Sequence, residues 1–353
     1  MTYPLPFAEL LQCAIDRGAS DIHLVSGIAP TVRIDTDLQM LDYPAFSKED
    51  ITSFVAEFIG DGMYQNMVNT RAEQDFSLSY NGHRFRCNTY FEGGSLAASL
   101  RLLSNHIPTM DELGLPGQLS SMLDHNQGLI IVAGPTGHGK STTLASIINK
   151  LLSERHWHII TIEDPIEYQF EHKKGIISQR EVGSDTVSFA AALRTALRED
   201  PDAVMVGEMR DRETVEAAMQ LAQTGHLVLT TLHTNSAAQT ANRIIDIFPE
   251  DQQSQARVDL AESLVGIFSQ RLLPKINGGR VLATELMIAT PAIRSIIRED
   301  KTHQLTNVIQ TSAAEGMISM DKSLAELVHR GEISLDEALS WALDPKALKL
   351  MIY

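Results

Sequence analysis

From about residue 119 onward, the chain alternates short apolar runs with longer stretches that have a helical period. Four of the runs are almost continuously apolar, and they cover residues 129–133, 158–162, 203–206 and 227–231. Runs of this kind are typical of strands that are buried on both faces. Because helical patterns separate them, we predict an α/β fold in which helices cover both faces of a parallel sheet.

Three of the intervening stretches place apolar residues on a single helical stripe, at positions i, i+3, i+4 and i+7. The stripes are Leu144, Ile147, Ile148 and Leu151; Phe189, Ala192, Leu193 and Ala196; and Val215, Ala218, Met219 and Ala222. Ser188 is a plausible N-cap for the second helix, and Gly225 is expected to end the third.

The first part of the chain, up to about residue 108, has shorter and more varied patterns. We predict a helix near residues 7–17, strands at 21–24 and 30–34, and helices within 48–68. Asn81-Gly82 is a type I′ turn signal that joins runs at 77–80 and 83–90, and a third run covers 96–103. These patterns indicate a small α+β domain with an antiparallel meander.

Four parts of the chain follow from these patterns. They are an N-terminal α+β domain (1–108), a linker rich in proline and glycine (109–118), the α/β core (119–290) and a helical C-terminal segment (291–353). Gly316 and Gly331 are expected to interrupt the last of these.

The first apolar run of the core leads directly into a phosphate-binding loop. Residues 134–141 read Gly-Pro-Thr-Gly-His-Gly-Lys-Ser, and a helical stripe follows. In such a loop, glycines let backbone N–H groups surround a β-phosphate, Lys140 reaches the β- and γ-phosphates, and the Ser141 hydroxyl is placed to bind Mg²⁺. The residues expected to contact nucleotide are Gly134, Pro135, Thr136, Gly137, His138, Gly139, Lys140, Ser141 and Thr142. The chain is therefore predicted to use a nucleoside triphosphate.

Polar residues follow each of the other three runs, at the edge of a parallel sheet where ligands bind. We predict that Glu208 orients the attacking water, since it follows a clean apolar run and Gly207 leaves room beside it. Glu163 and Glu167 are candidates to hold Mg²⁺ through its waters, with Ser141 as a direct ligand. His233 is a candidate donor to the γ-phosphate. For Glu167, a structural role such as capping remains as plausible as a functional one.

Phosphoryl transfer also needs positive charge near the transferred group, and a neighbouring subunit can supply it as an arginine. Arg84, Arg86 and Arg101 lie on the predicted meander, where alternation places Arg84 and Arg86 on one face. Surface arginines on a solvated sheet are an equally plausible interpretation.

Composition narrows the class of protein. The formal net charge of −16 disfavours a nucleic-acid motor, which neutralises phosphates with clustered lysine and arginine. Cys13 and Cys87 are the only cysteines, too few for a disulfide framework or a four-cysteine zinc site. We found no apolar run of the length that a transmembrane helix needs and no signal-like start, and so we expect a cytoplasmic protein without direct membrane insertion.

Four segments resemble, in order, the P-loop, acidic box, second acidic motif and histidine box of the secretion ATPases. They are residues 134–142, 160–168, 197–211 and 224–234. Within that superfamily, the sequence is most similar to the type IV pilus retraction ATPases, the twitching-motility motors. The similarity extends from residues 18–23 to 316–321, and it includes residues 291–299, which resemble the Ala-Ile-Arg motif of the retraction motors.

This resemblance implies a RecA-like ATPase core, a PAS-like N-terminal domain and a homohexameric ring that binds ATP and Mg²⁺ between the two domains. It implies that Glu208 is the catalytic carboxylate, that His226 and His233 form the histidine-box pair, and that His226 belongs to the nucleotide-binding residues. By the same resemblance, Arg86 and Arg101 reach the nucleotide. The ring would dock at the inner face of the cytoplasmic membrane and act on the pilus platform protein.

Two positions depart from the family pattern: His138 replaces a small serine, and Ser295 replaces an asparagine. We expect the His138 side chain to point away from the phosphate and to add at most a pH-sensitive effect. Ser295 bears on coupling to retraction and not on hydrolysis.

Several alternatives remain open at the level of sequence. One is an assembly or type II secretion ATPase, although such proteins typically carry a four-cysteine zinc module that is absent here. Others are an accessory retraction paralogue, a motor of a type IV secretion apparatus, and a nucleotide-gated scaffold that does not hydrolyse ATP productively.

Overall fold

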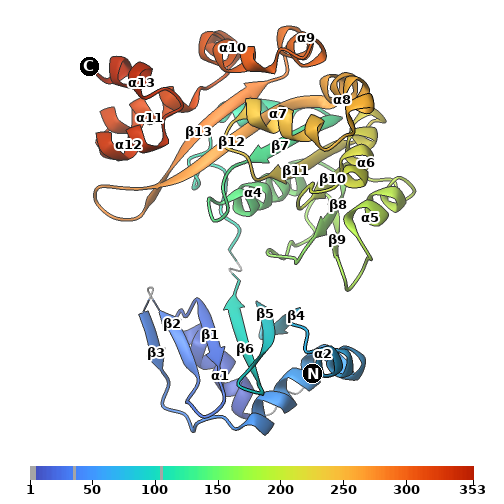
Figure 1. Ribbon diagram of the computed structural model, residues 1–353, viewed down its shortest axis with the longest axis vertical. Coiled ribbons are helices and arrows are strands. Elements are labelled where there is room, and N and C mark those ends of the chain that lie inside the picture. Colours follow the sequence, from blue (N-terminus) through green and yellow to red (C-terminus); the bar gives the residue numbers. More distant parts are fainter. Residues whose placement is uncertain (1–4, 35–36, 104–105) are drawn as a thin grey trace. The chain divides into compact units, whose positions relative to one another are not determined.

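The computed structural model describes residues 5–34, 37–103 and 106–353, and it divides into two compact units (Figure 1). The first unit contains residues up to 106 together with 167–169, and the second contains the remaining residues from 107 onward. The two units are described separately below.

The first unit is a six-stranded antiparallel sheet with two helices. Its elements are α1 (Leu5–Asp16), β1 (Asp21–Leu24), β2 (Thr31–Ile34), β3 (Asp37–Met40), α2 (Lys48–Thr70), β4 (Gln74–Tyr80), β5 (His83–Glu92) and β6 (Ser95–Leu102), with strand order β3-β2-β1-β6-β5-β4. Asn81 and Gly82 both have positive φ, 51° and 77°, as the predicted type I′ turn requires. The predicted α+β arrangement is confirmed, and β3 is a strand that the sequence analysis missed.

The second unit is built on a seven-stranded sheet. Its strands are β7 (Gly128–Ala133), β8 (His158–Glu163), β9 (Ile176–Glu181), β10 (Ala203–Val206), β11 (Leu227–Leu232), β12 (Leu264–Pro274) and β13 (Arg280–Ile288), in the order β13-β12-β7-β11-β10-β8-β9. All neighbours pair in parallel except β12 and β13, which form an antiparallel hairpin. The four predicted strands are confirmed as β7, β8, β10 and β11, and they lie side by side in the middle of the sheet.

Helices cover both faces of this sheet (Figure 1). They are α3 (Gly117–Met122), α4 (Lys140–Glu154), α5 (Phe189–Ala196), α6 (Arg212–Gln223), α7 (Ala237–Asp246) and α8 (Glu250–Ser263). Alternation along β7 assigns its side chains to the two faces: Leu129 and Ile131 pack in the core with α5–α8, and Ile130 and Val132 in the core with α3 and α4. This burial on both faces confirms the predicted fold class. Ser188 caps α5 as expected, accepting a hydrogen bond from the Ala191 N–H.

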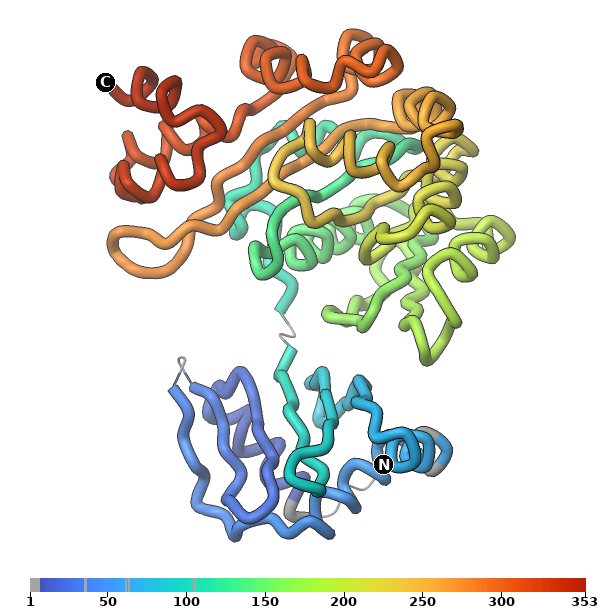
Figure 2. Tube along the Cα trace, in the orientation of Figure 1, coloured from blue at the N-terminus to red at the C-terminus, as the bar shows by residue number. Residues whose placement is uncertain are grey.

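The C-terminal part is helical, as predicted. It contains α9 (Pro291–Arg298), α10 (Leu305–Thr311), α11 (Met320–His329), α12 (Leu335–Trp341) and α13 (Pro345–Ile352). Figure 2 shows the last three helices beside the long β12–β13 hairpin, with which they share a core. Gly316 and Gly331 have positive φ and lie where the helical pattern breaks. Within the parts of the chain that the structure describes, no helix has the length and apolar character needed to cross a membrane.

Candidate nucleotide site

The phosphate loop connects the carboxyl end of β7 to the first turn of α4. Gly139 has φ 82° and caps α4, and Lys140 is the first residue of that helix. The backbone N–H groups of the first helical turn have no partner within the helix, and they face the loop together with the positive end of the helix dipole. The local structure is therefore a site for an anion such as a phosphate group.

Lys140 is buried beneath this loop, with 7% of its surface exposed. Its ammonium donates to the carbonyl oxygens of Gly134 at 2.8 Å and Pro135 at 2.9 Å. The Nδ1 atom of His233 lies 3.3 Å from the same Nζ atom. The loop and His233, which follows β11, therefore hold the ammonium of Lys140 against the backbone of the loop.

His233 connects the loop to Glu208. Its Nδ1 atom also lies 3.2 Å from the Thr136 hydroxyl, and its Nε2 atom lies 3.5 Å from Oε2 of Glu208. Because an ammonium can only donate, Nδ1 of His233 accepts from Lys140, and in the neutral ring Nε2 carries the proton and points it at the carboxylate. Burial, reinforced by the charge of Lys140, lowers the pKa of His233 although Glu208 opposes the shift. The neutral ring is thus the favoured form at pH 7.

Glu208 lies immediately beyond β10, next to the loop. Its side chain is 15% exposed, and its Oε1 atom accepts from Arg210 at 2.8 Å. The Thr231 hydroxyl donates to the Gly207 carbonyl at 2.6 Å and so ties the end of β11 to this turn. The structure therefore brings the side chains of Glu208, His233, Thr136 and Lys140 together, as the sequence analysis expected for a water-orienting carboxylate beside a phosphate loop.

Gly207 packs against the end of β8. A Cβ atom at this position would lie 3.4 Å from the Ile162 carbonyl oxygen and 3.6 Å from Glu163 Cα, at the end of β8. A side chain at position 207 would thus be in ordinary van der Waals contact with β8. The room that Gly207 leaves for water stays a prediction.

Glu163 is buried at the carboxyl end of β8, the strand next to β10. Its Oε1 atom accepts from the Thr161 hydroxyl at 2.7 Å and from the Gln179 amide at 3.3 Å. These contacts fix a carboxylate at the correct edge of the sheet. Glu167 lies within residues 167–169, which the division of the chain assigns to the first unit, and its role stays a prediction.

The structure does not bring His226 to the loop of its own chain. His226 directly precedes β11, and its carbonyl accepts from the N–H of Gly128 at the amino end of β7. The His226 ring contacts the end of α6, with Nδ1 3.1 Å from the Leu221 carbonyl oxygen. His233 stands at the opposite end of the same strand, and a strand of six residues is roughly 20 Å long. A contact between His226 and nucleotide in the same subunit is therefore not supported by this placement.

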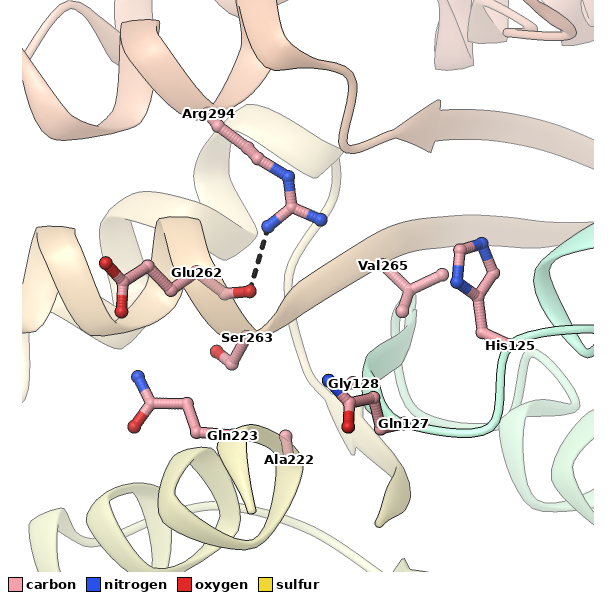
Figure 3. Close-up of a pocket in the computed structure, with 9 residues that line it drawn as sticks. All are labelled: His125, Gln127, Gly128, Ala222, Gln223, Glu262, Ser263, Val265 and Arg294. Atoms are coloured by element: carbon pink, nitrogen blue, oxygen red, sulfur yellow. Dashed lines mark hydrogen bonds between the residues drawn. The ribbon is translucent and has the colours of Figure 1, made fainter. Parts of the chain in front are cut away.

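A pocket of about 380 Å³ also lies at this amino edge (Figure 3). Its lining residues are His125, Gln127, Gly128, Ala222, Gln223, Glu262, Ser263, Val265 and Arg294. Arg294 belongs to the segment that resembles the Ala-Ile-Arg motif, and Figure 3 shows its guanidinium donating to the Glu262 carbonyl, at 2.9 Å. The pocket is separate from the phosphate loop.

In the first unit, Arg86 and Arg101 are directly opposite each other on β5 and β6, and Asp21 of β1 is directly opposite Arg101. Directly opposed residues share a face of the sheet. The Nε atom of Arg101 donates to Asp21 at 2.8 Å, while 68% of the Arg101 side chain stays exposed. The two arginines are thus clustered on an accessible face, and their contact with nucleotide stays a prediction.

The His138 ring turns towards β12, in keeping with the expectation that it points away from the phosphate. Its Nδ1 atom accepts from the Leu272 N–H at 3.0 Å, and its centre lies 5.6 Å from that of the Trp341 ring. Burial and the charges of Arg271, Lys140 and Arg280 lower the pKa of His138. Gln270 of the same strand is a further residue at the loop that the sequence analysis missed.

A parallel sheet that carries a phosphate loop at the end of one strand, and a catalytic-type carboxylate at the end of another strand on the same edge, defines a P-loop NTPase. The family model described as "Type II/IV secretion system protein" matches residues 5–340. The chain belongs to this family and is an ATPase.

Individual relatives agree with this assignment. The chain is 43% identical over 343 residues to the type IV pilus retraction ATPase PilT of Pseudomonas aeruginosa, covering 97% of this chain and 99% of the relative. It is 37% identical over 350 residues to the type IV pilus ATPase PilU of the same organism, covering 99% and 91%. A crystal structure of the pilus retraction motor PilT with bound ADP superimposes with a TM-score of 0.91 at 49% identity, covering 97% of this chain and 98% of that one.

Proposed function

We propose that this chain is an ATP-driven motor that retracts type IV pili and so powers twitching motility. The observation that carries the proposal is 43% identity over nearly the whole length of the P. aeruginosa PilT protein, in a chain whose Lys140, His233 and Glu208 side chains meet at the phosphate loop. A fold-level likeness alone would support only the class of enzyme.

Glu208 is assigned as the residue that orients and polarises the attacking water. Its carboxylate is held by Arg210 on one oxygen and by the neutral His233 ring on the other, so it is fixed beside the loop without being neutralised by a buried cation. Lys140 neutralises charge on the β- and γ-phosphates, and His233 is placed to respond when the γ-phosphate leaves.

The residues at the site fit Mg²⁺. The Ser141 hydroxyl is exposed at the first turn of α4, and the fixed carboxylate of Glu163 supplies the hard oxygen chemistry that Mg²⁺ prefers, directly or through water. When bound, the ion would neutralise charge that develops between the β- and γ-phosphates. Glu167 is retained as a weaker candidate for the same role.

Arg86 and Arg101 are assigned as arginines that reach the nucleotide within a homohexameric ring. Both lie on a shared, accessible face of the sheet, where Arg101 pairs with Asp21 and keeps 68% of its side chain exposed.

The motor is proposed to dock at the inner face of the cytoplasmic membrane and to act on the platform protein of the pilus. The net charge of −16 favours a protein partner over nucleic acid. An accessory retraction ATPase is the second candidate, because the chain is similar over 99% of its length to PilU, a second type IV pilus ATPase of the organism that also has PilT.

Two substitutions test the chemistry. Lys140→Ala is expected to abolish phosphate release, and Glu208→Gln is expected to retain ATP binding while lowering kcat by about 10²- to 10⁴-fold, the usual contribution of a positioned base. Glu216→Gln on the exposed face of α6 is the matched control, and its turnover should equal that of the wild type. Undiminished turnover in Glu208→Gln would remove Glu208 from its assigned role.

A second experiment tests whether the motor retracts or assembles pili. The same variants are expressed in cells that lack the native protein. For a principal retraction motor, cells that lack the protein are expected to carry abundant pili that do not retract. Retraction should then recover only when the wild type or Glu216→Gln is expressed. Cells without surface pili would show an assembly motor instead. Normal retraction in the absence of the protein would favour the accessory role.

A further inference from the structure

Strand β12 carries three consecutive polar residues inside the sheet. Ser269, Gln270 and Arg271 interrupt an otherwise apolar strand, and their exposed fractions are only 1%, 1% and 5%. Burying a polar side chain is unfavourable unless it is hydrogen-bonded. Gln270, the middle residue, finds both of its partners at the phosphate loop.

The side-chain amide of Gln270 bridges the loop and the helix that follows it. Its Nε2 atom donates to the main-chain carbonyl of His138 at 2.7 Å, and its Oε1 atom accepts from the Thr143 hydroxyl at 2.8 Å. Because a carbonyl can only accept, the NH₂ group must face His138, and the amide orientation is fixed. One side chain thus fastens the second half of the loop to the first turn of α4.

The loop lies directly on this part of β12 at both of its ends. A Cβ atom at Gly134 would lie 2.5 Å from the Gln270 carbonyl oxygen, closer than non-bonded atoms allow. A Cβ atom at Gly139 would lie 3.3 Å from Leu272 Cδ1 and 3.4 Å from the Gln270 amide nitrogen. Both glycines also have positive φ. Two glycines of the motif are therefore required by contact with β12 as well as by the phosphate.

We propose that Gln270 is a positioning residue for nucleotide binding, whose amide holds the phosphate loop and the start of α4 in the conformation that receives the phosphates. The inference rests on the proposed nucleotide site and extends it by a residue about 130 positions away in sequence, as the separations of 132 and 127 for its two hydrogen bonds show.

The physical reason is pre-organisation. A loop that binds phosphate through backbone N–H groups must turn the intervening carbonyls away from the anion. Gln270 binds one of those carbonyls from the side of β12, so less conformational freedom is lost when nucleotide binds. Without the amide, the His138 carbonyl would be buried without its donor or would turn toward the phosphates.

This role predicts a change in binding rather than in chemistry. ATP and ADP contact the loop through the same phosphates, so loss of pre-organisation weakens both, raising KM more than it lowers kcat. A purely structural role would lower the melting temperature of the nucleotide-free protein and leave the nucleotide affinity of the folded molecules unchanged. The two interpretations are thus separable.

The experiment measures the Kd of Mg²⁺-ADP for the full chain, with an ADP that carries a fluorescent ribose group. Gln270→Leu should raise Kd about tenfold or more, since two hydrogen bonds that order the loop are lost. Gln270→Glu should do likewise, because a carboxylate oxygen would face the His138 carbonyl. Ser269→Ala, the adjacent buried residue on the strand, is the control and should bind within about twofold of the wild type.

A second pair of variants keeps the test decisive if Gln270→Leu does not fold. Thr143→Val removes the hydroxyl that donates to Gln270 and should raise Kd. Thr143→Ser retains a hydroxyl and should keep the wild-type Kd. Wild-type Kd in either Gln270→Leu or Thr143→Val would overturn the proposal. A wild-type chain that binds no ADP would instead refute the nucleotide site itself, and a failure to retract pili with normal ADP binding would refute only the proposed motor function.

Discussion

The ring of His138 connects the phosphate loop to the C-terminal helices. Its Nδ1 atom accepts a hydrogen bond from the Leu272 N–H, which requires the neutral ring in the tautomer that carries its proton on Nε2. The charges of Arg271 and Lys140 add to burial in lowering the pKa of this ring. A serine at this position would be too short to make the same contact with β12.

This contact predicts how stability depends on pH. Because the pKa of His138 is lower in the folded state than its unfolded value of about 6.5, its stabilising contribution is complete above that pH and is lost as pH falls toward the folded-state pKa. Between pH 7.5 and pH 5.5, the melting temperature of His138→Ser should therefore fall by less than that of the wild type, when both are measured without nucleotide.

The control for this prediction is His156→Ser, which removes an exposed histidine and should leave the pH dependence of the melting temperature as in the wild type. If His138→Ser and the wild type lose the same amount on acidification, the hydrogen bond to Leu272 does not contribute to the pH response. His233 is present in all three proteins, so its own titration cancels from the comparison.

At the scale of whole elements, Arg294 joins helix α9 to the end of helix α8. Its guanidinium donates to the carbonyls of Ala261 and Glu262 in the last turn of α8 and, at 3.0 Å, to the carbonyl of Ala289. A cation at a helix C-terminus satisfies carbonyls that have no partner within the helix and interacts favourably with the helix dipole. The arginine of the Ala-Ile-Arg pattern thus has a structural role in this chain.

Replacing this residue should separate its structural role from its charge. Arg294→Ala is expected to lower the free energy of unfolding by about 1–3 kcal/mol, the range for losing charged hydrogen bonds to buried partners. Arg298→Ala on the same helix removes the same charge from an exposed position and should change stability by less than about 0.5 kcal/mol. Urea unfolding, followed by a spectroscopic signal from the second unit, measures the free energy of unfolding of both variants. Equal losses of stability in the two variants would contradict the role given to Arg294.

Ser295, the second departure from the family pattern, lies one residue further along α9. Its hydroxyl donates to Oε1 of Glu299 at 2.7 Å, and Lys301 donates to the other oxygen of that carboxylate at 2.7 Å. These two hydrogen bonds lower the pKa of Glu299. The Ser295 side chain therefore binds Glu299, the residue that caps the C-terminus of α9.

The periodicity of the sequence was sufficient for the central strands and insufficient for the edges of the sheet. β7 and β10 are apolar because both of their faces are covered, and such a run is visible in the sequence. β9 reads Ile-Ile-Ser-Gln-Arg-Glu, because an edge strand has less to bury. β12 was missed because Ser269, Gln270 and Arg271 interrupt its apolar run.

The same division holds for the site. The phosphate loop could be predicted because its residues are consecutive and each has a chemical reason. Glu208 and His233 could be predicted because parallel strands deliver their carboxyl ends to one edge. Gln270 could not be placed at the loop, because no local pattern relates it to residues 138 and 143. The only sign in the sequence is a polar residue within an apolar run. That sign can be interpreted only from the structure, in which β12 pairs with β7, the strand that leads into the loop.

At the scale of the whole molecule, buried polar contacts connect the sheet to the C-terminal helices. Arg271 donates to the carbonyls of Trp341 at 2.6 Å and Asn235 at 3.0 Å. Glu285 of β13 accepts from the Ala237 N–H at 2.7 Å, and burial raises the pKa of Glu285 to about 7. Through Arg271, the C-terminal helices are thus joined to the strand that also carries Gln270.

The proposed arginines and the phosphate loop belong to different compact units of the chain. Because a neighbouring subunit can supply the arginine for phosphoryl transfer, we predict that each site of the proposed ring needs Lys140 from one subunit and Arg86 from the next. Arg86→Ala and Lys140→Ala should each lower the turnover of a pure ring by orders of magnitude, since a transition-state arginine contributes about 10³- to 10⁵-fold.

Mixing the two inactive variants tests this arrangement directly. When a subunit with Lys140→Ala lies next to one with Arg86→Ala, one of the resulting interfaces contains both an intact loop and an intact arginine, and phosphate release should reappear. Mixing Arg86→Ala with Glu208→Gln should also restore activity, because Glu208 lies with the loop. Mixing Lys140→Ala with Glu208→Gln should not, since both variants damage the same half of the site. No recovery in the first two mixtures, although mixed rings form, would show that each subunit completes its own site. Recovery in the last mixture would show that Lys140 and Glu208 of one site come from different subunits.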